Sequence, residues 1–538
     1  AVAMTGGQPV DNHFTVPQIA AQVWAEGITA LRIVTDEPEK YAIGTKWPEA
    51  ATLHHRDELD EIQRELREVE GVTVIIYDQT CATEKRRRRK RGQMYDPPKR
   101  IFINQLVCEG CGDCGVVSNC VSIVPVETEF GRKRAIDQSS CNKDFSCVKG
   151  FCPSFVNVIG GQVRKNSAAG DVRPDLFPVL PDPVVPAAKD PYGIVVTGIG
   201  GTGVVTIGAL IGMAAHIEGK GVTVLDMTGL AQKGGAVMSH IRVADNPEDL
   251  HAVRVASGGA KLMLACDMVT AASTDGLAKI SRGETMAVVN TKRTMNGDFT
   301  SNPDAAFPAD EMMSSIREAA GENSTHFVDA SGVATALLGD SIASNLFTLG
   351  FAFQKGFVPV SAEAIERAVA INGVAVEFNL QAFLWGRRMA HDAQAVEAVA
   401  APAQARPKHL DMSRDLDEII QRRAAYLTDY QDAAYAKRYT DLVATLRKAE
   451  ETKSPGHEDL AQAVARNAFK LMAIKDEYEV ARLFTEGTFE RQIAEQFEGD
   501  YHLEFNLAPP LWSQRDLETG ELQKRTYGRW VLSAFRVL

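Results

Sequence analysis

Hydrophobic and polar positions in the first 80 residues alternate between a helical and a strand pattern. The stretches VPQIAAQVWAEG (16–27) and DELDEIQRELREVEG (57–71) place apolar side chains at helical spacing. Short apolar runs follow each of them, in ALRIVTDE (30–37) and VTVIIYD (72–78). This order predicts an α/β region with a parallel sheet.

A second α/β pattern begins after the proline-rich linker of residues 171–191. The stretch GIVVTGIGGTGVVTIGALIGMAA (193–215) carries no charge and is long enough to cross a membrane. Its seven glycines instead favour a buried strand, a tight turn and a helix. We therefore expect a doubly wound domain over residues 192–395 and no membrane-spanning segment.

The remaining segments have other patterns. Residues 85–170 show little periodicity, so we expect metal ligation to supply much of their folding energy. The alanine-rich stretch 393–407 is expected to be a linker. Apolar positions from Leu416 to Leu427 have helical spacing, which predicts a mostly helical module over residues 410–538, with YHLEFNL (501–507) as a strand.

Charge and cysteine usage narrow the classes of function. The net charge of −12 argues against nucleic acid as a partner. The basic run from Glu84 to Arg91 is expected to be a solvated or interface-facing helix end, and docking of an acidic electron carrier is a second interpretation. Seven of the nine cysteines fall between Cys108 and Cys152, and no signal peptide opens the chain, which indicates a reducing cytoplasm and a metal site.

The cysteine spacing predicts a [4Fe–4S] cluster. In CEGCGDC, three cysteines stand at the two-residue spacing of an iron–sulfur ligand loop, but the next one, Cys120, follows five residues later without a proline. A Cys-Pro pair does occur in SSCNKDFSCVKGFCPSF (139–155), at Cys152. We therefore assign the first cluster to Cys108, Cys111, Cys114 and Cys152.

Three further cysteines, Cys120, Cys141 and Cys147, leave two interpretations open. They hold a second cluster with one other ligand, or they are structural thiols. Zinc is the competing metal for the whole group, although a third cysteine at the next two-residue step is typical of a cluster. Cys266 lies in an apolar strand and is expected in the core.

The glycine-rich stretch also carries a dinucleotide fingerprint. Gly198, Gly200 and Gly203 have G-x-G-x-x-G spacing, and Asp226 ends the next strand, where an acid binds a ribose. Further on, Lys233 precedes Gly234 and Gly235. Two interpretations fit this order: the backbone approaches an anionic or flat ligand closely beside the lysine, or the glycines form a simple turn.

Four stretches together resemble the 2-oxoacid:ferredoxin oxidoreductases, and most closely the long fused indolepyruvate form. They are AVAMTGGQPVD at the start, the two cysteine stretches, GIGGTGVV with QKGGAVMSH, and the helical tail with LAPPLW. The resemblance implies oxidative decarboxylation of a 2-oxo acid such as indolepyruvate to acyl-CoA and CO2. It implies thiamine diphosphate, Mg²⁺ and [4Fe–4S] clusters as cofactors, CoA as cosubstrate and ferredoxin as electron acceptor.

The resemblance also implies roles for particular residues. Residues 1–84 would be the end of a thiamine diphosphate-binding domain, whose magnesium and diphosphate loop falls on Ala1, Thr5, Gly6, Gly7 and Gln8. The family's Gly-Asp-Gly motif lies upstream of this loop, so we expect a fragment, or a subunit that other chains complete, in a homo-oligomer. The CoA or substrate side would fall on Gly198, Gly200, Gly201, Gly203, Lys233, Gly234 and Gly235.

Two other functions fit parts of the sequence. An NAD(P)-linked iron–sulfur electron-transfer subunit would use the glycine turn and Asp226. A noncatalytic assembly subunit would use the cysteines for a structural metal.

Overall fold

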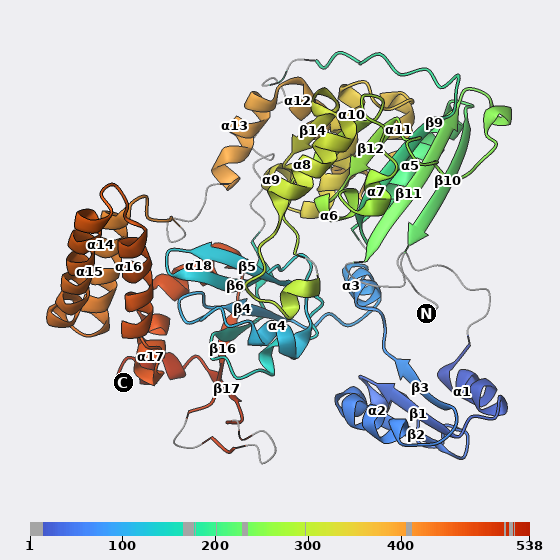
Figure 1. Ribbon diagram of the computed structural model, residues 1–538. Coiled ribbons are helices and arrows are strands. Elements are labelled where there is room, and N and C mark those ends of the chain that lie inside the picture. Colours follow the sequence, from blue (N-terminus) through green and yellow to red (C-terminus); the bar gives the residue numbers. More distant parts are fainter. Residues whose placement is uncertain are drawn as a thin grey trace. The chain divides into compact units, whose positions relative to one another are not determined.

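The computed structural model describes residues 14–164, 177, 179–200, 202–228, 235–295, 297–404, 411–509, 513–515, 520 and 522–538. The chain divides into two compact units (Figure 1). One comprises Ala1–Asp96 with Thr228–Gly235, and the other comprises Pro97–Met227 with Ala236–Leu538.

The first unit is a small α/β layer structure. Its three strands lie in the order β2-β1-β3 and are all parallel. Leu31 and Ile33 pack toward α1 on one face, whereas Ala30 and Val34 pack toward α2 on the other, as strand alternation requires. The elements are α1 (Val16–Ala25), β1 (Ala30–Thr35), β2 (Ala51–His55), α2 (Leu59–Arg67), β3 (Thr73–Asp78) and, over the basic run, α3 (Ala82–Lys90).

The cysteine-bearing segment of the second unit has more regular structure than its sequence predicts. Two of its strands run antiparallel to each other, and two others form a hairpin. The elements are β4 (Lys99–Ile103), α4 (Asp113–Ser118), β5 (Ile123–Thr128), β6 (Gly131–Ile136), η3 (Ser146–Val148), β7 (Phe155–Ile159) and β8 (Gln162–Val163).

The glycine-turn region forms a six-stranded sheet in the order β10-β11-β9-β12-β13-β14. Strands β9, β12, β13 and β14 are parallel, and β11 is antiparallel to β9. The strands are β9 (Tyr192–Ile199), β10 (Gly221–Thr228), β11 (Ala236–Ala244), β12 (Leu262–Ala265), β13 (Met286–Asn290) and β14 (Thr325–Val328).

Helices cover both faces of this sheet, in agreement with the predicted doubly wound fold. Leu262 and Leu264 point into one large core, whereas Met263 and Ala265 point into the core on the opposite face. The helices are α5 (Val204–Ile217), α6 (Met268–Ala271), α7 (Thr274–Leu277), α8 (Ala309–Ala320), α9 (Ala330–Leu338), α10 (Ser344–Gln354), α11 (Ala362–Asn372), α12 (Val376–His391) and α13 (Ala393–Gln404).

Helix α13 replaces the linker that we expected over residues 393–407. Val396 and Ala400 are fully buried in the core of the sheet domain, one helical turn apart. Alanine has the highest helix propensity, so an alanine-rich stretch with two apolar residues at this spacing folds as a packed helix.

The C-terminal region is mostly helical, as the sequence predicts, and also contains strands. Figure 1 shows α14, α15 and α16 lying side by side. The elements are α14 (Leu416–Tyr430), α15 (Ala433–Lys453), α16 (Asp459–Met472), α17 (Glu477–Thr485), α18 (Thr488–Gln496), β15 (Phe497–Glu498), β16 (His502–Leu507), β17 (Arg525–Gly528) and α19 (Val531–Phe535).

These C-terminal strands pair with strands of the cysteine-bearing segment. One antiparallel sheet has the order β17-β16-β7-β4, in which Phe505 is opposite Val156. A second short pairing joins β15 to β8. Two segments that the sequence presents as separate therefore share one sheet.

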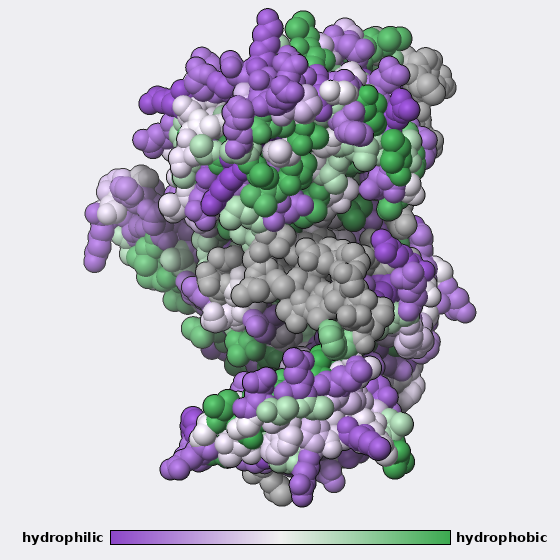
Figure 2. Space-filling view, turned by 90° about the vertical axis from the view of Figure 1, so that its right-hand side faces the viewer, coloured by the Kyte–Doolittle hydropathy of each residue, from purple (hydrophilic) through white to green (hydrophobic). Residues whose placement is uncertain are grey.

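The outer strand β10 leaves apolar side chains exposed at the edge of the six-stranded sheet. Val224 and Met227 are 37% and 40% exposed. Figure 2, which looks at the right-hand side of Figure 1, shows hydrophobic residues gathered among hydrophilic ones on this face. An unpaired strand edge with apolar side chains is typical of a surface that another chain covers.

None of the helices that the structure describes combines the length and hydrophobicity needed to span a lipid bilayer. The uncharged stretch 193–215 forms β9, a turn and α5, as its glycines predict.

A buried ion pair fastens the β5–β6 hairpin to α14. The carboxylate of Glu129 pairs with Arg423, and the two side chains are 6% and 4% exposed. Arg423 Nη2 also donates to the Glu129 carbonyl at 2.7 Å, and Ser413 N donates to Glu129 Oε2 at 2.6 Å. Burial alone would raise the pKa of Glu129, but these hydrogen bonds lower it below its ordinary value.

We predict that Arg423→Met lowers the free energy of unfolding by about 3–5 kcal/mol, because the buried Glu129 carboxylate loses its closest cation and keeps Ser413 N and Arg422 Nη1, which lies 3.9 Å away. The additional change Glu129→Gln should restore part of this loss. Urea denaturation followed by circular dichroism measures both effects. Lys437→Met is the control, since the pair Lys437–Asp441 is 71% and 62% exposed and should contribute less than about 1 kcal/mol. An Arg423→Met protein as stable as the unmodified one would contradict the prediction.

Candidate metal centre

Four cysteines from two distant stretches line one small cavity. Cys108 and Cys111 precede α4, Cys114 lies in its first turn, and Cys152 lies just before β7. The same cavity is lined by Ile103, Gly112, Arg134, Ser154 and Phe155. The structure thus brings together the four residues that the sequence predicts as ligands of the first cluster.

Two glycines allow the ligand loop to turn and to pack closely. Gly110 and Gly112 have φ angles of +73° and +87°, in the left-handed region that favours glycine. A Cβ atom on Gly110 would lie 2.2 Å from the carbonyl oxygen of Arg132, and one on Gly112 would lie 2.5 Å from Pro303 Cβ. Gly110 N donates to Cys108 Sγ at 3.3 Å, a bond that stabilises negative charge on this sulfur.

The other three cysteines gather beside the first group. Cys147 interacts electrostatically with Cys120, with Cys141 and, more weakly, with Cys114 of the first group. Lys143 N donates to Cys141 Sγ at 3.4 Å, which repeats the bond two residues after Cys108. No fourth cysteine joins this group among the described residues. All nine cysteines lie in the described part of the chain, and none forms a disulfide.

Burial makes the thiolate form of these cysteines costly. Burial and, after it, the neighbouring thiols together raise the pKa of Cys114 and of Cys147 to about 12. A cysteine must lose its proton to bind metal. The two groups therefore need nearby positive charge to act as ligands.

Arg134 brings positive charge to the wall of the cavity. Its side chain is 2% exposed and lies 4.7 Å from the ring centre of Phe299. The guanidinium donates to the carbonyl oxygens of Lys133 at 3.2 Å and of Pro303 at 2.8 Å. Within the described ranges no carboxylate pairs with it, and it lowers the pKa that burial raises at Cys114. A buried cation without an acidic partner fits a cavity that holds a negatively charged group.

Sequence reasoning missed Arg134. The only signal was the run of three consecutive basic residues in GRKRAI (131–136), between the two cysteine runs.

No three or more His, Cys, Asp or Glu side chains in the part of the chain that the structure describes are grouped as ligands of a metal ion. The arrangement that the structure shows is four thiols around a cavity, and their ligation of iron remains a prediction.

Packing within the protein accounts for the glycine turn. A Cβ atom on Gly198 would lie 2.5 Å from Val204 Cγ2 and 3.0 Å from Cys266 Cβ. Gly203 has a φ angle of +100° and begins α5. Gly200 lies between them in the turn, and Gly235 directly precedes β11. Gly201, Lys233 and Gly234, like the thiamine loop at Ala1, Thr5, Gly6, Gly7 and Gln8, lie outside the described residues.

The strand order does not support a dinucleotide site at Asp226. In a dinucleotide-binding fold, the acid ends the parallel strand next to the glycine-turn strand. Here β11 lies between β10 and β9 and runs antiparallel to β9. The Asp226 carboxylate accepts a hydrogen bond from the hydroxyl of Ser239 on β11.

Two family descriptions match parts of the chain. Residues 193–389 match the pyruvate ferredoxin/flavodoxin oxidoreductase family, and residues 416–538 match a family of unknown function, DUF6537.

Individual relatives match the same central region. The indolepyruvate oxidoreductase subunit IorB of Archaeoglobus fulgidus is 30% identical over 200 residues, which is 37% of this chain and 94% of that subunit. The subunit of the same name from Methanothermobacter thermautotrophicus is 29% identical over 194 residues, or 36% of this chain and 94% of that subunit. The solved gamma subunit of a keto/oxoacid ferredoxin oxidoreductase from Geobacter sulfurreducens has 24% identity and a TM-score of 0.27, covering 37% of this chain and 98% of its own.

We predict that Gly198→Ala destabilises the sheet domain by about 1–3 kcal/mol, because the added methyl group overpacks the space between Val204 and Cys266. Thermal unfolding of the purified protein measures this effect. Gly219→Ala is the control, since it has a positive φ but no neighbouring atom within 4 Å of a Cβ, and it should cost about 1 kcal/mol. Gly198→Ala with unchanged stability would show that packing does not explain this glycine.

Proposed function

Because the chain belongs to the 2-oxoacid:ferredoxin oxidoreductase family, we propose that it is the electron-transfer part of an enzyme that oxidatively decarboxylates a 2-oxo acid. The observation that carries the proposal is the cavity lined by Cys108, Cys111, Cys114 and Cys152 with the buried Arg134 at its wall. These four cysteines would hold a [4Fe–4S] cluster, and Cys120, Cys141 and Cys147 would hold a second one with a further ligand.

A [4Fe–4S] cluster supplies one-electron transfer. The chain's own residues hold and tune it. Gly110 N–H and Lys143 N–H donate to ligand sulfurs, and Arg134 offsets the negative charge of the thiolates. Cys147 and Cys114 belong to one apolar cluster and lie near enough for the charge of one to raise the pKa of the other, which supports transfer from one cysteine group to the other.

We propose ferredoxin as the acceptor at the first cysteine group. Cys111 is exposed, and so are the apolar side chains of Val116 and Val117 on α4 and of Phe151 beside Cys152. An exposed ligand surrounded by apolar side chains suits a transient contact with an electron-carrier protein.

The names of the relatives support a proposal for the substrate. The IorB subunits bear the name indolepyruvate oxidoreductase, so we propose an aryl pyruvate such as indolepyruvate, with CoA as acyl acceptor. Thiamine diphosphate and Mg²⁺ would meet the chain at Thr5–Gln8. We propose that other subunits or another part of the same enzyme complete that site, and the apolar edge of β10 offers a surface for such a contact.

The two other functions have less support. An NAD(P)-linked subunit needs an acid beside the glycine turn, and Asp226 is bound by Ser239 on an intervening strand. A noncatalytic subunit with structural zinc differs from our proposal in the metal it contains.

We predict that Cys152→Ser and Cys111→Ser abolish the same [4Fe–4S] signal in electron paramagnetic resonance spectra of the reduced protein, because both residues line one cavity. The protein should be purified anaerobically and its iron and zinc measured. Cys266→Ser is the control, since Cys266 follows β12 of the six-stranded sheet and does not line the cysteine cavity. It should leave the signal intact. Stoichiometric zinc without iron would overturn the proposal, and a full signal in Cys152→Ser would overturn the ligand assignment.

We predict that the protein does not bind NADH with micromolar affinity, because Asp226, the acid of the fingerprint, lies on β10, which β11 separates from the glycine-turn strand β9. Isothermal titration calorimetry with the unmodified protein and with Asp226→Ala tests this. Micromolar affinity that Asp226→Ala abolishes would favour the NAD(P)-linked subunit instead.

A further inference from the structure

The segment that matches DUF6537 is built into the cysteine-bearing domain. Strand β16 pairs with β7, which begins three residues after Cys152. Asn506 Nδ2 on β16 donates to the Phe155 carbonyl at 3.2 Å and to Asn157 Oδ1 at 3.1 Å. Phe102 and Val156 share one core with Phe484 and Phe505. The segment therefore fixes the position of the strand that follows the fourth predicted ligand, Cys152.

Two lysines of this segment reach the predicted ligand loops. Lys475 Nζ donates to the carbonyl oxygens of Val107 at 3.4 Å and of Cys108 at 3.2 Å, and it pairs with Glu109 at 2.8 Å. Its side chain is 13% exposed. The Glu109 carboxylate therefore offsets the positive charge that Lys475 places beside the first ligand loop.

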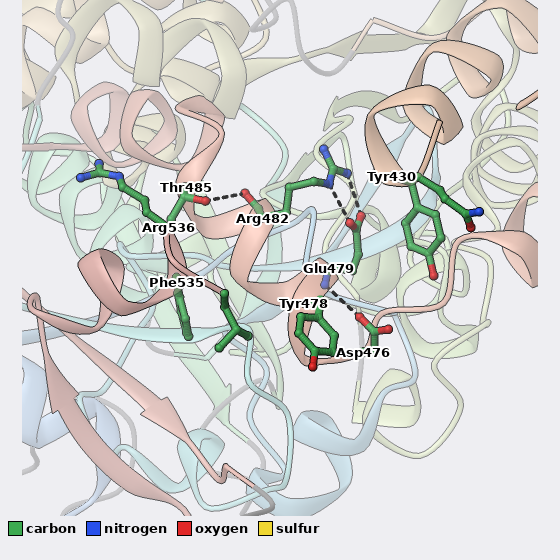
Figure 3. Close-up of a pocket in the computed structure, with 10 residues that line it drawn as sticks. Tyr430, Asp476, Tyr478, Glu479, Arg482, Thr485, Phe535 and Arg536 are labelled. Atoms are coloured by element: carbon green, nitrogen blue, oxygen red, sulfur yellow. Dashed lines mark hydrogen bonds and ion pairs between the residues drawn. The ribbon is translucent and has the colours of Figure 1, made fainter. Parts of the chain in front are cut away.

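Figure 3 shows how α17, which follows Lys475, is held. Asp476 caps the helix by accepting a hydrogen bond from Glu479 N at 2.9 Å, and Glu479 pairs with Arg482 at 2.7 Å. These residues line a pocket of about 680 Å³ at the surface of this segment. The Asp476 cap and the Glu479–Arg482 pair stabilise α17 and satisfy one another's polar groups. We therefore assign no ligand to the pocket.

Lys524, just before β17, is placed differently. Its Nζ donates to the carbonyl oxygen of Val148 at 3.3 Å and lies 5.8 Å from the ring centre of Phe155. Val148 is the residue after Cys147 of the second cysteine group, and Phe155 lies three residues after Cys152 of the first. Burial lowers the pKa of Lys524, whereas the charges of Cys152, Asp113, Cys147 and Cys114 oppose this effect. Across the described ranges no carboxylate forms an ion pair with it.

We propose that residues 416–538 complete the iron–sulfur domain and that Lys524 makes its iron–sulfur centres easier to reduce. The inference rests on the proposed function, since it requires the cysteines to hold such centres. Reduction adds a negative charge to a centre, and a half-buried cation that lies beside both cysteine groups stabilises the reduced form more than the oxidised form. Lys475 has a smaller net effect because Glu109 offsets its charge.

The test is a redox titration of the anaerobic full chain, followed by electron paramagnetic resonance. In Lys524→Gln and Lys524→Met, the ratio of reduced to oxidised centre at a fixed potential should fall by about tenfold for at least one centre. For a one-electron centre this corresponds to a shift of about 59 mV to lower potential. Lys524→Arg should keep the ratio within about twofold, because it keeps the charge.

The double variant Lys475→Gln/Glu109→Gln is the matched control. It removes a half-buried lysine without changing the net charge, so its centres should titrate as in the unmodified protein. Unchanged titration in both neutral variants of Lys524 would overturn the inference and leave the proposed function intact. Loss of the centres in both neutral variants would overturn it too, since Lys524 would then serve assembly. An unmodified protein without iron–sulfur signals would instead overturn the proposed function itself.

Discussion

The backbone pairing between β7 and β16 is the interaction on which the candidate metal centre depends. It brings together residues that are 351 positions apart in the sequence, as the hydrogen bond from Asn506 to Phe155 shows. On the other side of β7, β4 completes the same sheet and leads into the loop that contains Cys108. The direct pairing of β4 with β7 brings the two ligand stretches to one cavity, and β16 on the opposite edge of β7 holds that pairing in place.

The cysteines and the basic residues around them each need the opposite charge of the other. The buried thiols need positive charge to become thiolates, and the buried Arg134 and the half-buried Lys524 need negative charge near them. Burial, and then the neighbouring Lys475, also lower the pKa of Lys133 to about 8. Each set of charges is costly alone in a low-dielectric site, and an anionic iron–sulfur centre would stabilise the cations that surround it. Binding of such a centre would therefore add to the stability of the fold.

Local signals in the sequence predict part of this arrangement. The spacing of Cys108, Cys111 and Cys114 and the proline after Cys152 are readable without a structure, and the structure places all four around one cavity. Periodicity likewise predicts the α/β layers and the strand at YHLEFNL, which β16 confirms. Two other features depend on contacts between distant residues. Arg134 on β6 lines the cysteine cavity and Lys524 contacts Val148, and the sequence shows neither contact. Strand β11 separates β10 from β9, although α5 and β10 follow β9 along the chain as they do in a dinucleotide-binding fold. The helix α13 was missed for a local reason, since alanine-rich composition suits both a linker and a helix and only burial of Val396 decides between them.

The match to a family of unknown function covers two different structural parts. Helices α14, α15 and α16 have a core of their own, around residues such as Leu427, Tyr439 and Phe469, and the pair Arg423–Glu129 attaches them to the β5–β6 hairpin. From α17 onward, the apolar side chains belong to the core that β4 and β7 share. The structural boundary therefore falls between α16 and α17, and Lys475 lies in this connection with its charge directed at the first ligand loop. The segment matched by sequence similarity thus contains a helical bundle, α14–α16, and a part from α17 onward that belongs to the cysteine-bearing domain. Lys524, whose charge reaches the cysteines, lies in the part from α17 onward.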